Sequence, residues 1–218
     1  MKNIKTFFSK YKHAWLLCYG FIYLPWFCYL EKTVTRHYHV MHVALDDFIP
    51  FNEYFIIPYL LWFFYIAATV IYFSFINKDK KEYWQLICTL GIGMTLFILI
   101  SLIYPNGQNL RPQLSGDSIF IRLVQSLYLV DTPTNILPSI HVFNSVACCI
   151  AIFRHKAFKQ HKLFLGGVWL LTVLIVLATV FLKQHTLVDV IAAVALNIVC
   201  FQLLYNPKAV HAEKPARV

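Results

Sequence analysis

Residues 163–182 read LFLGGVWLLTVLIVLATVFL, and Lys183-Gln184-His185-Thr186-Leu187-Val188-Asp189 follows at once. An uncharged run of ~20 residues is the length that a helix needs to cross the hydrocarbon core of a bilayer. Five other apolar stretches resemble it, so we expect an all-α, polytopic membrane protein of six transmembrane helices. The predicted spans are Ala14–Leu30, Tyr54–Ile76, Tyr83–Tyr104, Ile140–Phe153, Leu163–Leu182 and Leu187–Tyr205.

The composition agrees with a single membrane domain. Of the 218 residues, 59% are hydrophobic and only 13% are charged, whereas soluble domains carry about 25% charged residues. We therefore predict one six-helix domain over residues 1–206 and a short polar tail over residues 207–218. The stretch Ile119–Val130, interrupted by Arg122, is predicted to be a helix in the membrane interface.

The formal net charge of +9 raises nucleic acid as a partner in a soluble protein. Here the basic residues flank apolar spans, which favours anionic lipid headgroups as partners and argues against nucleic acid. With both termini on the cytoplasmic side, 14 of the 19 Lys and Arg residues lie inside, as the positive-inside rule requires. The five that remain outside are Lys32, Arg36, Arg111, Arg122 and Lys183.

This topology places four chemically suitable residues at the same external face. His185 and Asp189 are spaced i,i+4, so they share one face of a helix. A carboxylate beside a histidine holds one ring nitrogen as a donor and directs the other nitrogen outward. His141 opens the neighbouring span, and Arg111 lies in the basic loop before it.

The residues around His141 suit a phosphate group. Pro138 and Ser139 are typical of a helix start, where free backbone N–H groups attract anions. The Arg111 guanidinium offers a planar fork to two phosphate oxygens. Lys183 is two residues before His185 and is predicted to reach the same pocket.

These residues resemble the type 2 phosphatidic acid phosphatase superfamily of membrane lipid phosphatases and phosphotransferases. The resemblance covers residues 104–193. The family's Pro-Ser-x-His motif is matched by Pro138-Ser139-Ile140-His141, and its His-x3-Asp motif by His185 and Asp189. Arg111-Pro112 matches the end of the first motif, and Asn135 matches the asparagine before the second.

Two positions depart from the family pattern. The first-motif lysine falls on Tyr104, and the third-motif arginine falls on Thr179. Both missing cations normally hold phosphate oxygens, so the phosphate clamp is thinner, and Lys183 is the predicted replacement. Lys183-Gln184-His185 also resembles the inositol-phosphorylceramide synthase branch, which transfers phospho-headgroups between lipids.

The resemblance implies a role for each residue. His185 attacks phosphorus and becomes a phosphohistidine, Asp189 orients it, and His141 acts as general acid and then base. Substrate phosphate is bound by Arg111, Ser139, Lys183, Pro138 and Asn135. No metal and no cofactor are implied. One histidine must hold a proton while the other must be free of one, so the pH–rate profile is expected to be bell-shaped.

The leading hypothesis is a lipid phosphatase that acts on a phosphatidate, phosphatidylglycerophosphate or polyprenyl pyrophosphate type of lipid. It would act at the external face of a membrane, which the compact chain suggests is a bacterial plasma membrane. The alternatives are a phosphotransferase with a lipid hydroxyl as acceptor, and a lipid-phosphate transporter or binding protein.

Two groups in the first external loop have weaker claims on function. The histidines His37, His39 and His42 could bind zinc or copper, but we expect interfacial residues near lipid headgroups. Asp46 and Asp47 are expected to shape or solvate this loop, with a substrate-headgroup contact as the alternative.

Overall fold

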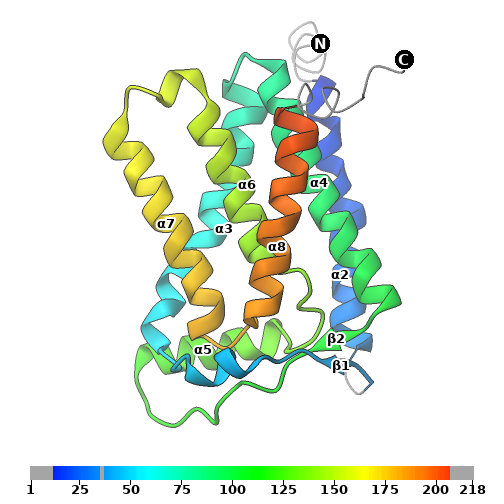
Figure 1. Ribbon diagram of the computed structural model, residues 1–218, viewed down its shortest axis with the longest axis vertical. Helices are drawn as coiled ribbons and strands as arrows, with labels where there is room; N and C mark the ends of the chain where they lie inside the picture. Colours follow the sequence, from blue (N-terminus) through cyan, green and yellow to red (C-terminus); the bar gives the residue numbers. More distant parts are fainter. Residues whose placement is uncertain (1–11, 35–36, 207–218) are drawn as a thin grey trace, which may run out of the picture.

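The computed structural model describes residues 12–34 and 37–206. Six helical segments run along the long axis, and the described chain begins and ends at the same end of the bundle (Figure 1). The first segment is η1 (Lys12–Tyr19) followed by α2 (Gly20–Thr33). The others are α3 (Ile56–Ile71) with η4 (Tyr72–Ile76), α4 (Lys80–Ile103), α6 (Ile140–Arg154), α7 (Lys162–Phe181), and α8 (Leu187–Cys200) with η6 (Phe201–Tyr205).

Four of these segments identify an integral membrane protein. Within the described residues, the helices long and apolar enough to cross a bilayer are Glu53–Ile76, Lys80–Ile103, Lys162–Phe181 and Leu187–Tyr205. They correspond to four of the six predicted spans. The predicted span Ala14–Leu30 falls on η1 and α2. The predicted span Ile140–Phe153 is α6, whose 15 residues cover about 22 Å, less than the ~30 Å core. Six spans therefore remain a prediction.

The longer connecting segments gather at one end of the bundle, which we call the α5 end (Figure 1). Helix α5 (Ile119–Val130) lies across this end, with the same bounds as the helix predicted for the interface. The protein is mostly helical, as predicted, but β1 (His39–Val40) and β2 (Asn106–Gly107) form a short parallel pair. The short helices η2 (Ala44–Phe48) and η3 (Glu53–Phe55) complete this end, and η5 (Lys156–Phe158) lies at the opposite end.

Polar side chains fix where three helices begin. The first backbone N–H groups of a helix lack partners within it, so a side-chain oxygen before the helix stabilises its start. Asp79 accepts from Lys81 N at 2.9 Å before α4, and Ser118 accepts from Ile121 N at 3.1 Å before α5. Ser139 accepts from Val142 N at 3.3 Å, so α6 begins directly after the predicted Pro138-Ser139 start.

The basic residues divide between the two ends as the sequence predicts. At the end opposite α5 the described cations are Lys78, Lys80, Lys81, Arg154, Lys156, Lys159 and Lys162. The α5 end holds Lys32, Arg111, Arg122 and Lys183. Lys2, Lys5, Lys10, Arg36, the side chain of Lys12 and the predicted tail over residues 207–218 lie outside the described part of the chain.

Helices α4 and α6 approach closely because Gly93 has no side chain. A Cβ built on Gly93 would lie 2.0 Å from the Phe143 ring, which is only 1% exposed. Another glycine of the same helix, Gly91, has no atom within 4 Å of such a Cβ. Substitution by alanine therefore changes helix propensity at both positions but disturbs packing only at Gly93.

We expect Gly93→Ala to destabilise the protein and Gly91→Ala to leave it equally or more stable. Alanine gains up to ~1 kcal/mol over glycine inside a helix, but overpacking a buried site costs about 1–3 kcal/mol. Thermal unfolding in detergent micelles measures both variants. Equal melting temperatures for the two would show that the α4–α6 contact adapts freely.

Candidate functional site

The two signature histidines meet at the α5 end. His141 is the second residue of α6, and His185 lies in the turn that leads into α8. Their ring centroids are 5.7 Å apart and the rings are tilted by 58°. Both side chains line one cavity. His141 and His185, 44 positions apart in the sequence, are therefore close enough for one small ligand to contact both.

Asp189 lies close to His185 as predicted, but the two do not share a helix face, because α8 begins only at Leu187 and His185 lies in the turn before it. The His185 Nδ1 to Asp189 Oδ2 distance is 3.5 Å, which is an ion-pair distance. His185 Nδ1 has no hydrogen-bond partner among the described residues. Asp189 is fully buried, and its Oδ2 accepts a hydrogen bond from Thr186 N at 2.8 Å. The carboxylate therefore fixes the start of α8 and faces the imidazole at the same time.

The positions of the two missing cations have other roles. Thr179 is fully buried, and its carbonyl oxygen accepts from Gln184 N at 2.9 Å and from His185 N at 3.0 Å. Its backbone therefore holds the turn that carries His185. The Tyr104 ring stacks on His39 with 4.3 Å between centroids. Neither residue supplies positive charge to the site.

Helix α3 provides an aromatic wall for His141. The His141 ring lies 4.7 Å from the Tyr59 ring and 4.4 Å from the Trp62 ring, measured between centroids. Trp62 Nε1 donates to the His141 carbonyl at 3.1 Å, and the Tyr59 hydroxyl donates to Asp131. The sequence did not single out these two aromatic residues, because their spacing also fits a lipid-facing or packed helix.

Arg111 is anchored between the loops of the α5 end. Its guanidinium donates to the carbonyl oxygens of Tyr128 at 3.2 Å and Asp131 at 2.6 Å, and to the side chain of Gln184. The guanidinium carbon also lies 4.2 Å from the centroid of the Tyr128 ring. Burial lowers the pKa of Arg111, while the nearby Asp131 carboxylate acts in the opposite direction. Arginine keeps its charge at any working pH.

Glu31 of α2 holds the loop before α6 in place. Its carboxylate accepts from Thr132 N at 3.0 Å and from Asn135 Nδ2 at 3.1 Å. Asn135 has a φ of +55°, a left-handed conformation that asparagine tolerates better than most residues. At the end of this loop, Ser139 N donates to the Asp189 carbonyl at 3.3 Å. The starts of α6 and α8 are therefore tied together, which keeps the two histidines in register.

Lys183 points to the η2 loop. Its Nζ donates to the Asp46 carbonyl at 2.8 Å, and burial lowers the pKa of this amine. Asp46 is itself buried, and its Oδ1 accepts from Leu187 N at 2.9 Å. Asp46 therefore shapes the loop, one of its two expected roles. Lys183 is outside the set of residues that line the cavity, so its phosphate contact stays a prediction.

The cavity gathers some of the predicted residues and several others. Its polar lining consists of the predicted His141, His185 and Asn135 together with Glu31, Asp131, Thr134 and Gln184. Arg111 stands behind this lining, hydrogen-bonded to Gln184 and to the Asp131 carbonyl. Ser139 and Pro138 are not part of the lining. The cavity measures about 10 Å³, the size of one water molecule. To admit a phosphate group, the side chains around it must move.

Glu31 and Asp131 are functional candidates that sequence reasoning missed. Glu31 directly follows the predicted first span, and an ionisable residue at a membrane edge is a signal that could have found it. Asp131 directly precedes the loop that contains Asn135. Within the described residues, no group of three or more His, Cys, Asp or Glu side chains is arranged to hold a metal ion.

Residues 108–209 match the family model of the PAP2 superfamily. The match covers His141, His185, Asp189 and Arg111, and it confirms the resemblance stated from these residues. The closer likeness to the inositol-phosphorylceramide synthase branch stays a prediction. Comparison of the chain with curated proteins and with solved structures gives no significant match.

Proposed function

We propose that this chain, which belongs to the PAP2 superfamily of lipid phosphatases and phosphotransferases, hydrolyses a lipid phosphomonoester or pyrophosphate through a phosphohistidine on His185. The observation that carries the proposal is the pair of histidine rings 5.7 Å apart across one cavity. A nucleophile needs about 3–3.5 Å to the atom it attacks, and a proton donor about 2.8 Å to the leaving oxygen. Because the P–O bond lies between these two contacts, the small cavity between the rings must open to admit the phosphate.

In the first step, Nε2 of His185 attacks phosphorus while the bond from phosphorus to the lipid oxygen breaks. His141 gives its proton to the departing alkoxide. Asp189 faces Nδ1 of His185 at 3.5 Å and stabilises the positive charge that the ring acquires. In the second step, His141 takes a proton from water, the resulting hydroxide attacks phosphorus, and the N–P bond breaks. Phosphate and free His185 are regenerated.

Arg111 is the proposed electrostatic partner of the phosphate oxygens. Its Nε has no hydrogen-bond partner among the described residues, so it retains donor capacity. A cation held in place before the reaction stabilises the charge that spreads over the phosphate oxygens in the transition state. Asn135 is the proposed second contact, because it is among the residues that line the cavity and its Nδ2 is a donor, which in this structure binds Glu31.

The reaction is proposed to take place at the external membrane face of a bacterial plasma membrane. The division of basic residues between the two bundle ends supports this orientation, since the end opposite α5 carries the larger number of described cations.

Phosphate release from a panel of purified lipid phosphates, with and without vanadate, tests the proposal. The panel contains phosphatidate, phosphatidylglycerophosphate and a polyprenyl pyrophosphate. We expect vanadate-sensitive release from at least one of them. Binding of these lipids without turnover, unchanged in His185→Asn, would instead support the transporter or binding-protein hypothesis.

The carboxylates in the cavity favour a second candidate, a phosphotransferase that moves a phospho-headgroup to a lipid hydroxyl. Glu31 and Asp131 line the cavity, whereas no Lys or Arg side chain in the described part of the chain does. Two carboxylates repel a doubly charged phosphomonoester more strongly than a singly charged phosphodiester. Labelled substrate distinguishes the candidates, because the label ends in free phosphate for the first and in a new phospholipid for the second.

We expect Glu31→Gln to shift substrate preference toward phosphomonoesters. Removing one negative charge from the cavity lining should change the relative kcat/KM by about tenfold. The measurement is the ratio of kcat/KM for phosphatidate to that for phosphatidylcholine. Asp117→Asn, an exposed carboxylate at the same end, is the matched control and should leave the ratio unchanged. An unchanged ratio in Glu31→Gln as well would remove the electrostatic argument for the transferase.

A further inference from the structure

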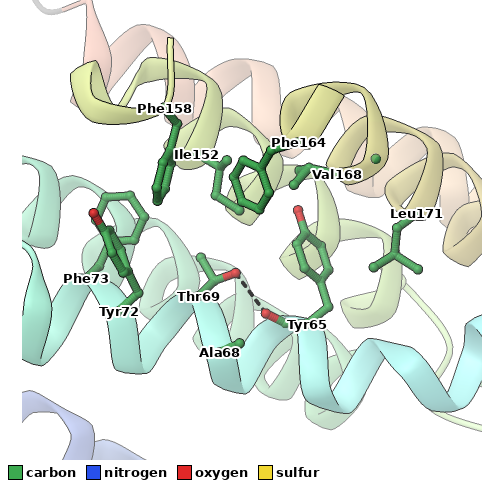
Figure 2. Close-up of a pocket in the computed structure, with 11 residues that line it drawn as sticks. Tyr65, Ala68, Thr69, Tyr72, Phe73, Ile152, Phe158, Phe164, Val168 and Leu171 are labelled. Carbon is green, nitrogen blue, oxygen red and sulfur yellow. Dashed lines mark hydrogen bonds between the residues drawn. The ribbon is translucent and has the colours of Figure 1, made fainter. Parts of the chain in front are cut away.

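A second, much larger cavity lies between α3, α6 and α7 near the end opposite α5. Its volume is about 480 Å³, within the range of ~300–1,000 Å³ that is usual for ligand pockets. Figure 2 shows Tyr65, Ala68 and Thr69 of α3 on one side, with Phe164 and Leu171 of α7 facing them. Gly167 of α7 also lines it, and a Cβ at Gly167 would have nothing within 4 Å.

The walls of this cavity offer a ligand almost only hydrocarbon. Their few polar groups already have partners. The Thr69 hydroxyl donates to the Tyr65 carbonyl at 2.8 Å (Figure 2), and the Tyr65 hydroxyl is 3.3 Å from Thr172 Oγ1. The Tyr72 hydroxyl is 2.9 Å from His155 Nε2. A ligand that fits this surface is an apolar chain rather than a polar molecule.

A cluster of lysines borders the cavity in the α6–α7 loop. Phe158, which lines the cavity, stands between Lys156 and Lys159, and Phe164 follows Lys162 by two residues. All three lysines are exposed, and none is in an ion pair among the described residues. The sequence contains no Asp or Glu between Asp131 and Asp189.

Within residues 12–34 and 37–206, the one carboxylate in contact with this loop already has other partners. Among the described residues, Glu82 Oε2 lies 2.5 Å from His155 Nδ1, and it accepts a hydrogen bond from Asn77 Nδ2 at 3.1 Å. The loop therefore presents uncompensated positive charge directly beside an apolar cavity.

We propose that this cavity binds an acyl chain of an anionic membrane phospholipid, whose phosphate headgroup lies against Lys156, Lys159 and Lys162. Basic pockets between transmembrane helices on the cytoplasmic side suit anionic headgroups. The acyl chain contacts the apolar walls and the phosphate binds the lysine ammonium groups, so one lipid molecule accounts for both parts of the surface.

This lipid site is distinct from the histidine site. Ile152, which lines the large cavity, is 11 residues beyond His141 on α6, a distance of about 16 Å along the helix. A headgroup held by the lysines is therefore far from the His141–His185 pair. The proposal does not depend on the reaction proposed above.

Native mass spectrometry of the full chain in detergent tests the headgroup part. The probes are phosphatidylglycerol and phosphatidylcholine with identical acyl chains, and we expect the protein to retain the anionic lipid preferentially. Lys156→Gln/Lys159→Gln should weaken phosphatidylglycerol binding by about tenfold or more. Lys78→Gln/Lys81→Gln removes the same charge from exposed residues at the same end and should change it little. Equal losses in the two double variants would overturn the headgroup assignment.

Two neighbouring glycines test the chain part. Gly167→Leu places a side chain into the cavity and should reduce retention of both lipids. Gly166→Leu adds the same side chain at a position that also has nothing within 4 Å but does not line the cavity, and it should retain both. Equal retention in the two variants would overturn the proposal. A dimer that is present in Gly166→Leu and lost in Gly167→Leu would also overturn it, because the cavity would then seat a second copy.

Discussion

Replacing His185 with alanine is expected to lower kcat for lipid dephosphorylation by about 10⁴–10⁶-fold. Alanine cannot form the phosphohistidine, and the remaining groups cannot provide an alternative nucleophile of similar strength. Any residual turnover would come from Arg111 and from orientation of the substrate. The measurement is the rate of phosphate release, together with transfer of labelled phosphate to the protein, which should disappear in the variant.

Loss of folding is separable from loss of chemistry in this experiment. His185 Nδ1 has no hydrogen-bond partner among the described residues but lies at ion-pair distance from the buried Asp189, so we expect the variant to melt at a lower temperature and still to unfold cooperatively. His37→Asn, an exposed histidine at the same end, is the matched control and should keep full activity. If His185→Ala retained turnover within about tenfold of wild type, His185 would not be the nucleophile.

Replacing Arg111 with lysine is expected to lower kcat/KM by about 10²–10³-fold and to reduce stability as well. A lysine keeps the charge but lacks the planar fork that binds two acceptors at fixed angles. It cannot reproduce the bonds to Tyr128 O, Asp131 O and Gln184. Each buried acceptor left without a donor costs about 1–3 kcal/mol of folding free energy.

Arg122→Lys is the matched control, because it makes the same substitution at a position outside the site. Arg122 is exposed on α5 at the same end, and its guanidinium donates to the Asp117 carbonyl at 3.1 Å. This variant should keep both kcat/KM and melting temperature. For Arg111→Lys, the change in kcat/KM is compared with the change in melting temperature. If its melting temperature falls while kcat/KM is unchanged, Arg111 only anchors the loops and does not contact phosphate.

Much of the fold could be predicted because its signals are local. A long apolar run specifies a helix of membrane length whatever surrounds it, and four of the predicted spans have helices of that length. The bounds of α5 and the capping of α6 by Ser139 also depend on neighbouring residues alone. The proximity of His185 and Asp189 also depends on residues close in the sequence, although His185 lies in the turn before α8 and not on the helix.

Contacts that join distant segments could not be predicted in the same way. Nothing near Glu31 in the sequence indicates that it binds Thr132 and Asn135, about a hundred residues later. Tyr59 and Trp62 look like any other aromatic residues of an apolar helix until α3 packs against His141. The hydrogen bond from the Lys183 ammonium to the Asp46 carbonyl likewise joins residues 137 positions apart, and the phosphate contact of Lys183 stays a prediction.

By itself, the sequence determined a mostly helical membrane protein and the motifs of the family whose model residues 108–209 match, with histidines at the starts of two helices. Apolar runs and motif spacing settle these properties because each depends on neighbouring residues. Only the tertiary structure decided that the two histidines share a cavity, that two carboxylates line it, and that a large apolar cavity lies beside the α6–α7 lysines. These features arise where helices distant in the sequence pack together, so their side-chain environment depends on contacts that no local pattern records.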